Sequence, residues 1–211
     1  MSSESLGARL SAGIGQLGLH NPPDEPQQQQ LIAYIEFLHR WNRKVNLTAI
    51  KSTDEMVERH LLDSLTVVPY LEGQSVIDVG SGAGLPGIPI AITQPAISVL
   101  MLDSAARKTR FIQQAIAELN LDNATVLHTR VQDATSQAAQ TVVARAFSTP
   151  VDIIESCRHL CSDGGVSVLF MAHVGNKLDV LPDECTLERV DAVNLPNSEA
   201  TRHIVVCRVR S

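Results

Sequence analysis

The stretch SVIDVGSGAGLPGIP, Ser75–Pro89, decides how the rest of the chain is interpreted. Its apolar start carries one acid, Asp78, and a run rich in glycine follows. A glycine-rich turn after a buried strand lets the backbone approach a nucleotide, because glycine has no side chain to obstruct the approach. The stretch therefore predicts a strand over 75–80, a ligand-binding turn and a helix near 87–93. The glycines are Gly80, Gly82, Gly84 and Gly87.

Two kinds of nucleotide fit such a turn, and two features decide between them. A dinucleotide fold and a methyltransferase fold both expect an acid for the ribose hydroxyls about 20 residues after the glycines, and Asp103 fits either. Asp78 would repel a pyrophosphate, whereas S-adenosylmethionine carries a cationic sulfonium and an ammonium but no phosphate. Pro86 and Pro89 also remove amide donors that a pyrophosphate needs. The sequence therefore predicts S-adenosyl-L-methionine as the cofactor.

Beyond the turn, short apolar runs alternate with helical segments. Two late segments, TLERVDAVNL and RHIVVCRVR, read as strands with no helix between them, an antiparallel pair that closes the sheet. This order predicts an α/β fold of the Rossmann-like class I methyltransferase type, with a seven-stranded, mostly parallel sheet and a terminal antiparallel hairpin. The earlier strands are predicted at 75–80, 97–103, 124–129, 141–146 and 165–171, and further helices near 105–119 and 150–161.

The first 72 residues read as a helical N-terminal extension. Residues 1–26 predict one short helix, and apolar residues recur at helical spacing over 31–45. A capping-box pattern at Ser52 predicts the start of a second helix. We expect this extension, residues 1–72, and the methyltransferase domain, residues 73–211, to form one compact unit.

Composition excludes several classes of protein. The chain of 211 residues is 44% hydrophobic but only 3% aromatic, so its core is aliphatic. No apolar run reaches the roughly 18 residues that span a bilayer, and no secretion signal is recognisable. The cysteines lack zinc-ligand spacing, so we expect no metal and a reduced, cytoplasmic protein. No apolar surface stripe is left over, which favours a monomer.

Charge is distributed unevenly along the chain. A net charge of −6 argues against a protein that coats nucleic acid through bulk electrostatics. Positive residues nevertheless gather locally, and we expect residues 40–60 to form an RNA-facing rim. The clusters are Arg40, Arg43, Lys44 and Lys51; Arg107, Lys108 and Arg110; and Arg202, His203, Arg208 and Arg210.

The residues around the end of the fourth predicted strand suit one kind of methylation. The segment ARAFSTP, residues 144–150, holds neither a general base nor a nucleophile. Guanine N7 carries a lone pair and no proton, so its methylation needs positioning and no base. We expect Arg145 to position the guanine by donating to O6 or by stacking on the ring, and Phe147 is a candidate stacking platform.

Five blocks of sequence occur in a recognisable order: WNRKVNLTAI (41–50), RHLLDSL (59–65), DVGSGAGLPGIP (78–89), LDS (102–104) and ARAF (144–147). From about Gln27 to the C-terminus the chain resembles the RsmG family, also called GidB. The resemblance implies a bacterial enzyme that methylates N7 of one guanine in the small-subunit (16S) ribosomal RNA. The implied partner is 16S rRNA or the 30S ribosomal particle, with neither DNA nor a membrane involved.

The resemblance also assigns roles to residues. It implies that Gly80 and Leu85 line the cofactor, that Val131 and Gln132 flank its adenine, and that Arg145 faces cofactor and substrate. The chain departs from the family at Gln132, where an acid is usual, and at FMAHVG (170–175), where the family carries a lysine–glycine pair. The expected cofactor-binding residues are Asp78, Gly80, Gly82, Gly84, Leu85, Asp103, Val131, Gln132 and Arg145. The expected RNA-binding residues are Arg40, Arg43, Lys44, Arg202 and His203.

Two other functions stay open on the sequence alone. A methyltransferase for small molecules would share the fold, but hydroxyl and amine substrates generally need a base, which the segment 144–150 lacks. A non-catalytic module that binds cofactor or RNA would not need an intact glycine turn with both Asp78 and Asp103.

Overall fold

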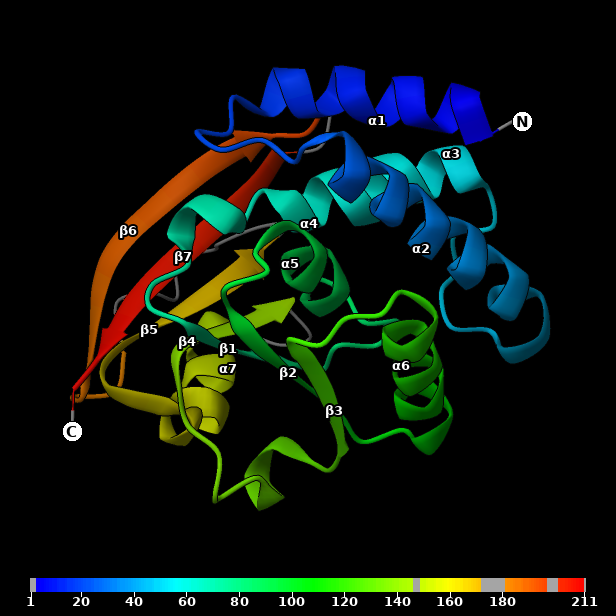
Figure 1. Ribbon diagram of the computed structural model, residues 1–211. Coiled ribbons are helices and arrows are strands. Elements are labelled where there is room, and N and C mark those ends of the chain that lie inside the picture. Colours follow the sequence, from blue (N-terminus) through cyan, green and yellow to red (C-terminus); the bar gives the residue numbers. More distant parts are fainter. Residues whose placement is uncertain (1–2, 146–148, 172–180, 197–200, 211) are drawn as a thin grey trace.

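The structure is a computed structural model that describes residues 3–145, 149–171, 181–196 and 201–210. Within these residues one sheet holds seven strands in the order β3-β2-β1-β4-β5-β7-β6 (Figure 1). The first five strands pair in parallel, and β7 runs antiparallel to both β5 and β6, so the predicted fold class is confirmed. The strands are β1 (Ser75–Val79), β2 (Ser98–Asp103), β3 (Ala124–His128), β4 (Ala139–Arg145), β5 (Cys161–Met171), β6 (Cys185–Asn194) and β7 (Thr201–Val209).

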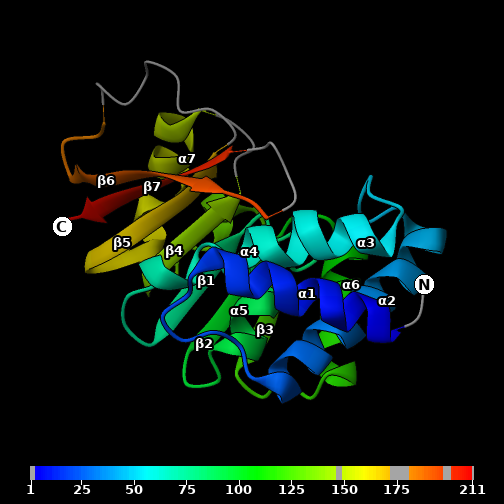
Figure 2. The ribbon, with the colours of Figure 1, turned by 90° about the horizontal axis from the view of Figure 1, so that it is seen from above.

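Helices cover the two faces of the sheet (Figures 1 and 2). Successive residues of a strand point to opposite faces. Val76 of β1 joins a core shared with α1, α2, α5 and α6, whereas Ile77 joins a second core shared with α7. The helices and helical turns are α1 (Ser3–Leu17), α2 (Glu25–Val45), α3 (Thr53–Met56), η1 (Val57–Leu62), α4 (Asp63–Leu65), η2 (Val68–Tyr70), α5 (Gly87–Thr93), α6 (Ala106–Glu118), η3 (Val131–Asp133), α7 (Pro150–Cys157) and η4 (Arg158–Leu160).

The N-terminal helices belong to the larger core. α1 occupies more of the first 26 residues than the short helix we expected, because Leu6, Leu10 and Ile14 recur at helical spacing and are all buried. Figure 1 shows α1 running across α2 and the α3–α4 segment, on the side away from the sheet. The extension therefore packs against the rest of the protein through apolar side chains. No described helix is long and apolar enough to cross a membrane.

Glutamine side chains of α2 form hydrogen bonds with the ends of two helices that pack on the sheet. Asp24 caps the helix by accepting from the Gln27 amide at 2.9 Å, while the Gln27 side chain accepts from the Asp24 amide at 3.0 Å. The Gln27 amide group also donates to the Ile92 carbonyl at 3.2 Å, and Gln30 donates to the Leu119 carbonyl at 2.7 Å. Polar side chains of α2 thus satisfy carbonyls at the C-terminal ends of α5 and α6.

Two predicted boundaries are wrong for identifiable reasons. The helix expected over 150–161 ends at Cys157, and the strand expected over 165–171 already begins at Cys161. Gly164 has φ 72°, and the β4–β5 register shifts at this end of the strands, so the strand continues through a bulge at Ser-Asp-Gly-Gly, which reads as a turn in the sequence.

The helix predicted to start at Ser52 does start there, but the predicted capping box is not formed. Ser52 stands at the N-cap of α3, but its side chain makes no capping hydrogen bond. The segment then continues through the π-helical turn η1 into α4. π-helical turns occur mainly at functional sites, and this one lies beside a cavity described below.

Candidate active site

Asp78 lies at the base of the glycine turn and is fully buried. Its Oδ2 accepts from the Gly87 amide at 2.8 Å. A Cβ atom on residue 87 would stand 2.8 Å from that oxygen and 2.4 Å from Met101, so only glycine lets the start of α5 come this close to β1. Its other oxygen, Oδ1, is buried with no hydrogen-bond partner among the described residues. A buried carboxylate with a free oxygen suits a cationic ligand.

Electrostatics agree with this interpretation of Asp78. Burial raises the pKa of the Asp78 carboxyl to about 7, and the Gly87 amide and the Arg145 guanidinium offset that rise only in part. A cation bound nearby would favour the ionised carboxylate and lower its pKa again. The ionised form of Asp78 would therefore be stabilised by a positively charged ligand.

Asp103, at the end of β2, holds the turn from the other side. Its Oδ2 accepts from the Gly82 amide at 2.9 Å and pairs with Lys108 at 3.4 Å, and its Oδ1 accepts from the Ala105 amide at 2.8 Å. A carboxylate has about four acceptor positions, so these contacts still leave room for a ribose hydroxyl. Asp103 thus fixes the turn and borders the cavity next to it.

A cavity of about 470 Å³ opens at the carboxyl ends of β1 and β2, where open α/β sheets bind ligands. Four of the expected cofactor residues line it, at the end of β1, the end of β2 and the turn η3: Gly80, Asp103, Val131 and Gln132. The other expected residues do not line it: the side chains of Asp78 and Leu85 are buried, Arg145 lines a different cavity, and Gly82 and Gly84 lie further along the turn. Sequence resemblance cannot separate a residue that contacts a ligand from one that packs behind it.

Arg145 lies in a second cavity, of about 310 Å³, at the ends of β4 and β5. Val79 of β1 pairs with Ala144 of β4, so the residues that follow each, Gly80 and Arg145, continue side by side from neighbouring strands. The two cavities therefore lie at the carboxyl ends of neighbouring strands. The lining of the second cavity is Ile50, Arg59, His60, Asp63, Arg145, Phe170 and Arg202.

Three arginines and a single carboxylate line this second cavity. Asp63 Oδ1 accepts from Arg202 Nε at 2.8 Å, and Asp63 Oδ2 lies 3.7 Å from an Arg145 amino group. The Asp63 side chain is 3% exposed, whereas those of Arg145 and Arg202 are 33% and 23% exposed. The cavity is positive in a chain that is negative as a whole, so it suits an anionic or electron-rich ligand.

His60 is neutral in this cavity. Burial and the nearby Arg145 lower the pKa of His60 to about 4. Its Nε2 lies 2.9 Å from the Thr48 hydroxyl, and its Nδ1 lies 3.1 Å from the Arg59 carbonyl. Because a carbonyl only accepts, Nδ1 carries the proton and Nε2 accepts from Thr48. Both ring nitrogens are therefore occupied.

Asn42 organises the loop that carries Thr48. Its Oδ1 accepts from the amides of Leu47 and Thr48 at 2.7 and 2.9 Å, and its Nδ2 donates to the carbonyls of Thr48 and Ile50, both at 3.0 Å. Asn42 is buried, so its role lies in shaping the loop.

The expected RNA-binding residues separate in space. Arg43 and Lys44 are exposed at the end of α2, whereas Arg40 leans over the Phe37 ring and pairs with Glu118 at 3.8 Å. Arg202 enters the cavity of Arg145, but its neighbour His203 does not line that cavity, since adjacent strand residues face opposite ways. Phe147 and residues 172–175 lie outside the described residues.

Tyr34 of α2 supports the glycine turn, and the sequence analysis missed it. Its hydroxyl donates to the Ala83 carbonyl at 2.6 Å, and the side chain is fully buried. Burial raises the pKa of Tyr34 well above its usual range, so the hydroxyl keeps its proton as a donor. Tyr34 occupies a core position of an amphipathic helix, where its sequence pattern indicates only packing. The hydrogen bond of its buried hydroxyl is what gives it a further role.

Replacing Tyr34 by phenylalanine should lower the free energy of unfolding by about 1–3 kcal/mol, because the Ala83 carbonyl is left buried without a partner. It should also weaken cofactor binding, because the turn loses its anchor. Urea unfolding and calorimetric titration measure the two effects. Tyr70→Phe is the matched control: that hydroxyl donates to Asp191 at 2.8 Å, whose side chain is 37% exposed and can bind water instead. Equal losses in the two variants would contradict a special role for Tyr34.

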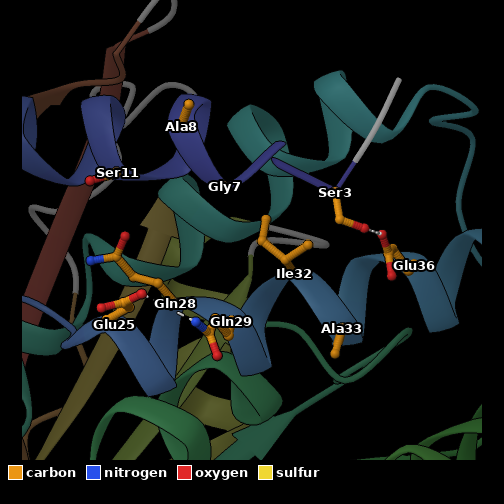
Figure 3. Close-up of a pocket in the computed structure, with 10 residues that line it drawn as sticks. All are labelled: Ser3, Gly7, Ala8, Ser11, Glu25, Gln28, Gln29, Ile32, Ala33 and Glu36. Atoms are coloured by element: carbon orange, nitrogen blue, oxygen red, sulfur yellow. Dashed lines mark hydrogen bonds between the residues drawn. The ribbon is translucent and has the colours of Figure 1, made fainter. Parts of the chain in front are cut away.

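A hollow of about 720 Å³, larger than the two cavities above, lies elsewhere, between α1 and α2 (Figure 3). Its polar lining includes Glu25 and Glu36 but no basic residue, and none of it comes from a strand. This composition does not suit RNA. Among the described residues no group of His, Cys, Asp or Glu could hold a metal ion.

Comparison with known proteins places the chain among ribosomal RNA methyltransferases. The family described as rRNA small subunit methyltransferase G (GidB) matches residues 27–205. The Ribosomal RNA small subunit methyltransferase G of Neisseria meningitidis serogroup C is 40% identical over 204 residues, covering 96% of this chain and 98% of that protein. The protein of the same name from Nitrosococcus oceani is 40% identical over 210 residues, covering 98% and 97%. A SAM dependent methyltransferase from Aquifex aeolicus shares the fold, with a TM-score of 0.55 and 16% identity over 74% of this chain and 93% of that one.

Proposed function

The chain belongs to the GidB family, rRNA small subunit methyltransferase G, and from that premise we propose that it transfers the methyl group of S-adenosyl-L-methionine to N7 of a single guanine in 16S rRNA. One observation carries this proposal. A cavity bordered by the glycine turn and a positive cavity that contains Arg145 both lie at the carboxyl ends of the strands, and β1 of the first is paired with β4 of the second. Such an arrangement places a nucleotide cofactor beside an RNA base.

The residues of the first cavity fit the cofactor. Asp103 borders the position of a ribose, and Val131 with Gln132 forms the wall for an adenine. Asp78 is fully buried and does not line the cavity, but it precedes the lining residue Val79 and supplies a negative charge beside the cavity. When bound, S-adenosylmethionine supplies an electrophilic methyl group on its sulfonium. The residue Gln132 is exposed and offers an amide where relatives in the family usually have an acid, so its contact runs through hydrogen bonds without charge.

The second cavity offers positioning and no base, which favours guanine N7 over a small-molecule hydroxyl or amine. His60 has both ring nitrogens occupied, and Asp63 is bound to two arginines. Guanine N7 has no proton to lose, so its lone pair needs only to be held in line with the methyl group. Arg145 donates to guanine O6, which fixes the ring and leaves N7 facing the first cavity.

Methyl transfer from labelled S-adenosylmethionine tests the proposed function directly. The substrates are 16S rRNA and 30S particles that lack the modification, followed by mapping of the labelled nucleotide. Label on one guanine is the expected result, and comparison of the two substrates shows which form of the RNA is methylated. Tight cofactor binding without any label would favour a small-molecule substrate, and no cofactor binding would favour a non-catalytic module.

The exposed end of α2 supplies a second test, of RNA binding. The double variant Arg43→Ala, Lys44→Ala should bind rRNA more weakly and with a salt dependence smaller by about two counterions, since each lost phosphate contact removes about one. Binding titrations over a range of salt concentrations measure the slope. The control pair is Arg158→Ala, Arg210→Ala, which lines a hollow at the other end of β5 together with Glu155 and Glu184. An unchanged slope in the first pair would contradict the proposed rim.

The proposal extends to the organisation of the protein. The extension, residues 1–72, and the methyltransferase domain, residues 73–211, act as one compact unit, which is supported by a core that holds side chains of both. The protein works as a monomer in the cytoplasm, where its ribosomal substrate is found. Sedimentation of the purified protein tests the oligomeric state.

A further inference from the structure

Asp63 joins three separate parts of the fold at one point. It lies in α4, at the end of the N-terminal extension, and contacts Arg145 at the end of β4 and Arg202 near the start of β7. Its side chain is 3% exposed, so nearly all of it is enclosed. The carboxylate is therefore covered by the residues it contacts, and a substrate reaches the guanidinium groups more readily than it reaches Asp63.

We propose that Asp63 is a positioning residue, which fixes the guanidinium groups of Arg145 and Arg202 as a pair on the wall of the substrate cavity. This inference rests on the proposed function, because the pair acts on the guanine or its phosphates. Two like charges on long side chains would move apart without a carboxylate between them. An arginine side chain has many rotamers, and ordering it costs conformational entropy. Because Asp63 already orders the two arginines, less entropy is lost when a ligand binds to them.

The neighbourhood of Asp63 supports this role over that of a base. Arg202 holds Oδ1 in a hydrogen bond of 2.8 Å, and Arg145 stands 3.7 Å from Oδ2, so arginines engage both oxygens of the carboxylate. On the same helical segment the neutral His60 and the exposed Arg59 complete the lining. Among the described residues Arg59 forms no ion pair, so Asp63 orders two of the three arginines.

The variant Asp63→Asn separates positioning from charge. It keeps the shape of the side chain and removes the charge, which leaves the guanidinium pair without its anchor. We expect kcat to fall about 100-fold, because small misplacements of positioning groups have effects of that size. RNA affinity should stay the same or increase, because the cavity becomes more positive, and affinity for S-adenosylmethionine should not change. A general loss of structure would lower all three quantities together.

A double-mutant cycle identifies the residue through which Asp63 acts. Arg145→Lys keeps the charge but not the planar fork, and it should lower kcat clearly in the unaltered protein. In the Asp63→Asn background the same change should cost about tenfold less, because Arg145 is already misplaced. The matched control is Asp191→Asn, a carboxylate that pairs with Arg189 at 3.0 Å on β6, outside both cavities. In that background the effect of Arg145→Lys should be unchanged.

Asp63→Glu keeps the inference testable if the asparagine variant does not fold. The charge is retained and the longer side chain shifts both guanidinium groups, so kcat should fall while RNA affinity and its salt dependence stay unchanged. Additive effects in the cycle, or parallel losses of kcat and RNA affinity in a folded variant, would overturn the role of Asp63 while leaving the proposed function standing. Absence of methyl transfer by the unaltered protein would overturn the proposed function, and the role of Asp63 with it.

Discussion

Replacing Arg145 by alanine should lower the rate of methyl transfer to 16S rRNA by about 100- to 1,000-fold, the usual effect of removing one well-placed donor. Affinity for S-adenosylmethionine should change little, because Arg145 lines the second cavity and not the one bordered by the glycine turn. Single-turnover transfer of labelled methyl groups measures the rate, and calorimetric titration measures cofactor affinity. The expected result is a slow enzyme that still binds its cofactor.

A matched arginine distinguishes this effect from a loss of charge. Arg189 is half exposed on β6, where it pairs with Asp191 and stacks over the Tyr70 ring, so Arg189→Ala removes the same group away from the cavities. That variant should transfer methyl groups at nearly the unaltered rate. If Arg145→Ala did the same, guanine positioning would have to come from other residues and the proposed mechanism would be wrong.

Replacing Asp78 by asparagine should stabilise the fold above pH 7 and weaken cofactor binding at the same time. Burial raises the pKa of this carboxyl from 3.8 to about 7, so the carboxyl contributes stability that is fully present below the unfolded pKa and lost as the pH rises through 7. Asparagine has the shape of the protonated acid and no charge. At about pH 8 the variant should exceed the unaltered protein by about 2–4 kcal/mol in free energy of unfolding, and near pH 4 the difference should vanish.

Cofactor affinity should move in the opposite direction. A charged hydrogen bond contributes about 1.5–3 kcal/mol, so Asp78→Asn should bind S-adenosylmethionine about 10- to 100-fold more weakly. In the unaltered protein the affinity should increase as the pH rises through 7 and Asp78 ionises, and in the variant this dependence should be lost. Asp122→Asn, at an exposed position, is the control. Equal affinities and equal pH profiles would show that Asp78 does not face the cofactor.

The order of strands and helices could be predicted from the sequence because it depends on local patterns. Buried strands such as β1 and β4 are near-continuous apolar runs, and α6 shows a clear apolar stripe around Phe111 and Ile112. The bulge at Gly164 could not be predicted in this way. Its glycines have the same local signal as a turn, and only pairing with β4 makes the segment a strand.

The site was predictable where chemistry and position coincide in the sequence. The turn around Gly82 and the acid Asp103 are recognisable because a nucleotide needs both at a fixed spacing. The roles of Tyr34 and Asp63 could not be predicted, because each lies in an apolar helical stretch and its partners are far away in the chain. Leu85 is assigned to the ligand from resemblance alone, and its side chain is buried in the core.

The hydrogen bond from Tyr34 to Ala83 has an evolutionary consequence. A helix that precedes the nucleotide-binding turn by some fifty positions in the chain sets the shape of that turn, at a contact of 2.6 Å. Exchanging the N-terminal helices for those of another methyltransferase would therefore alter the cofactor turn as well as the surface that meets the substrate. New substrate preferences in this lineage should arise by point substitution within the helices, and chimaeras joined near residue 72 should lose affinity for the cofactor.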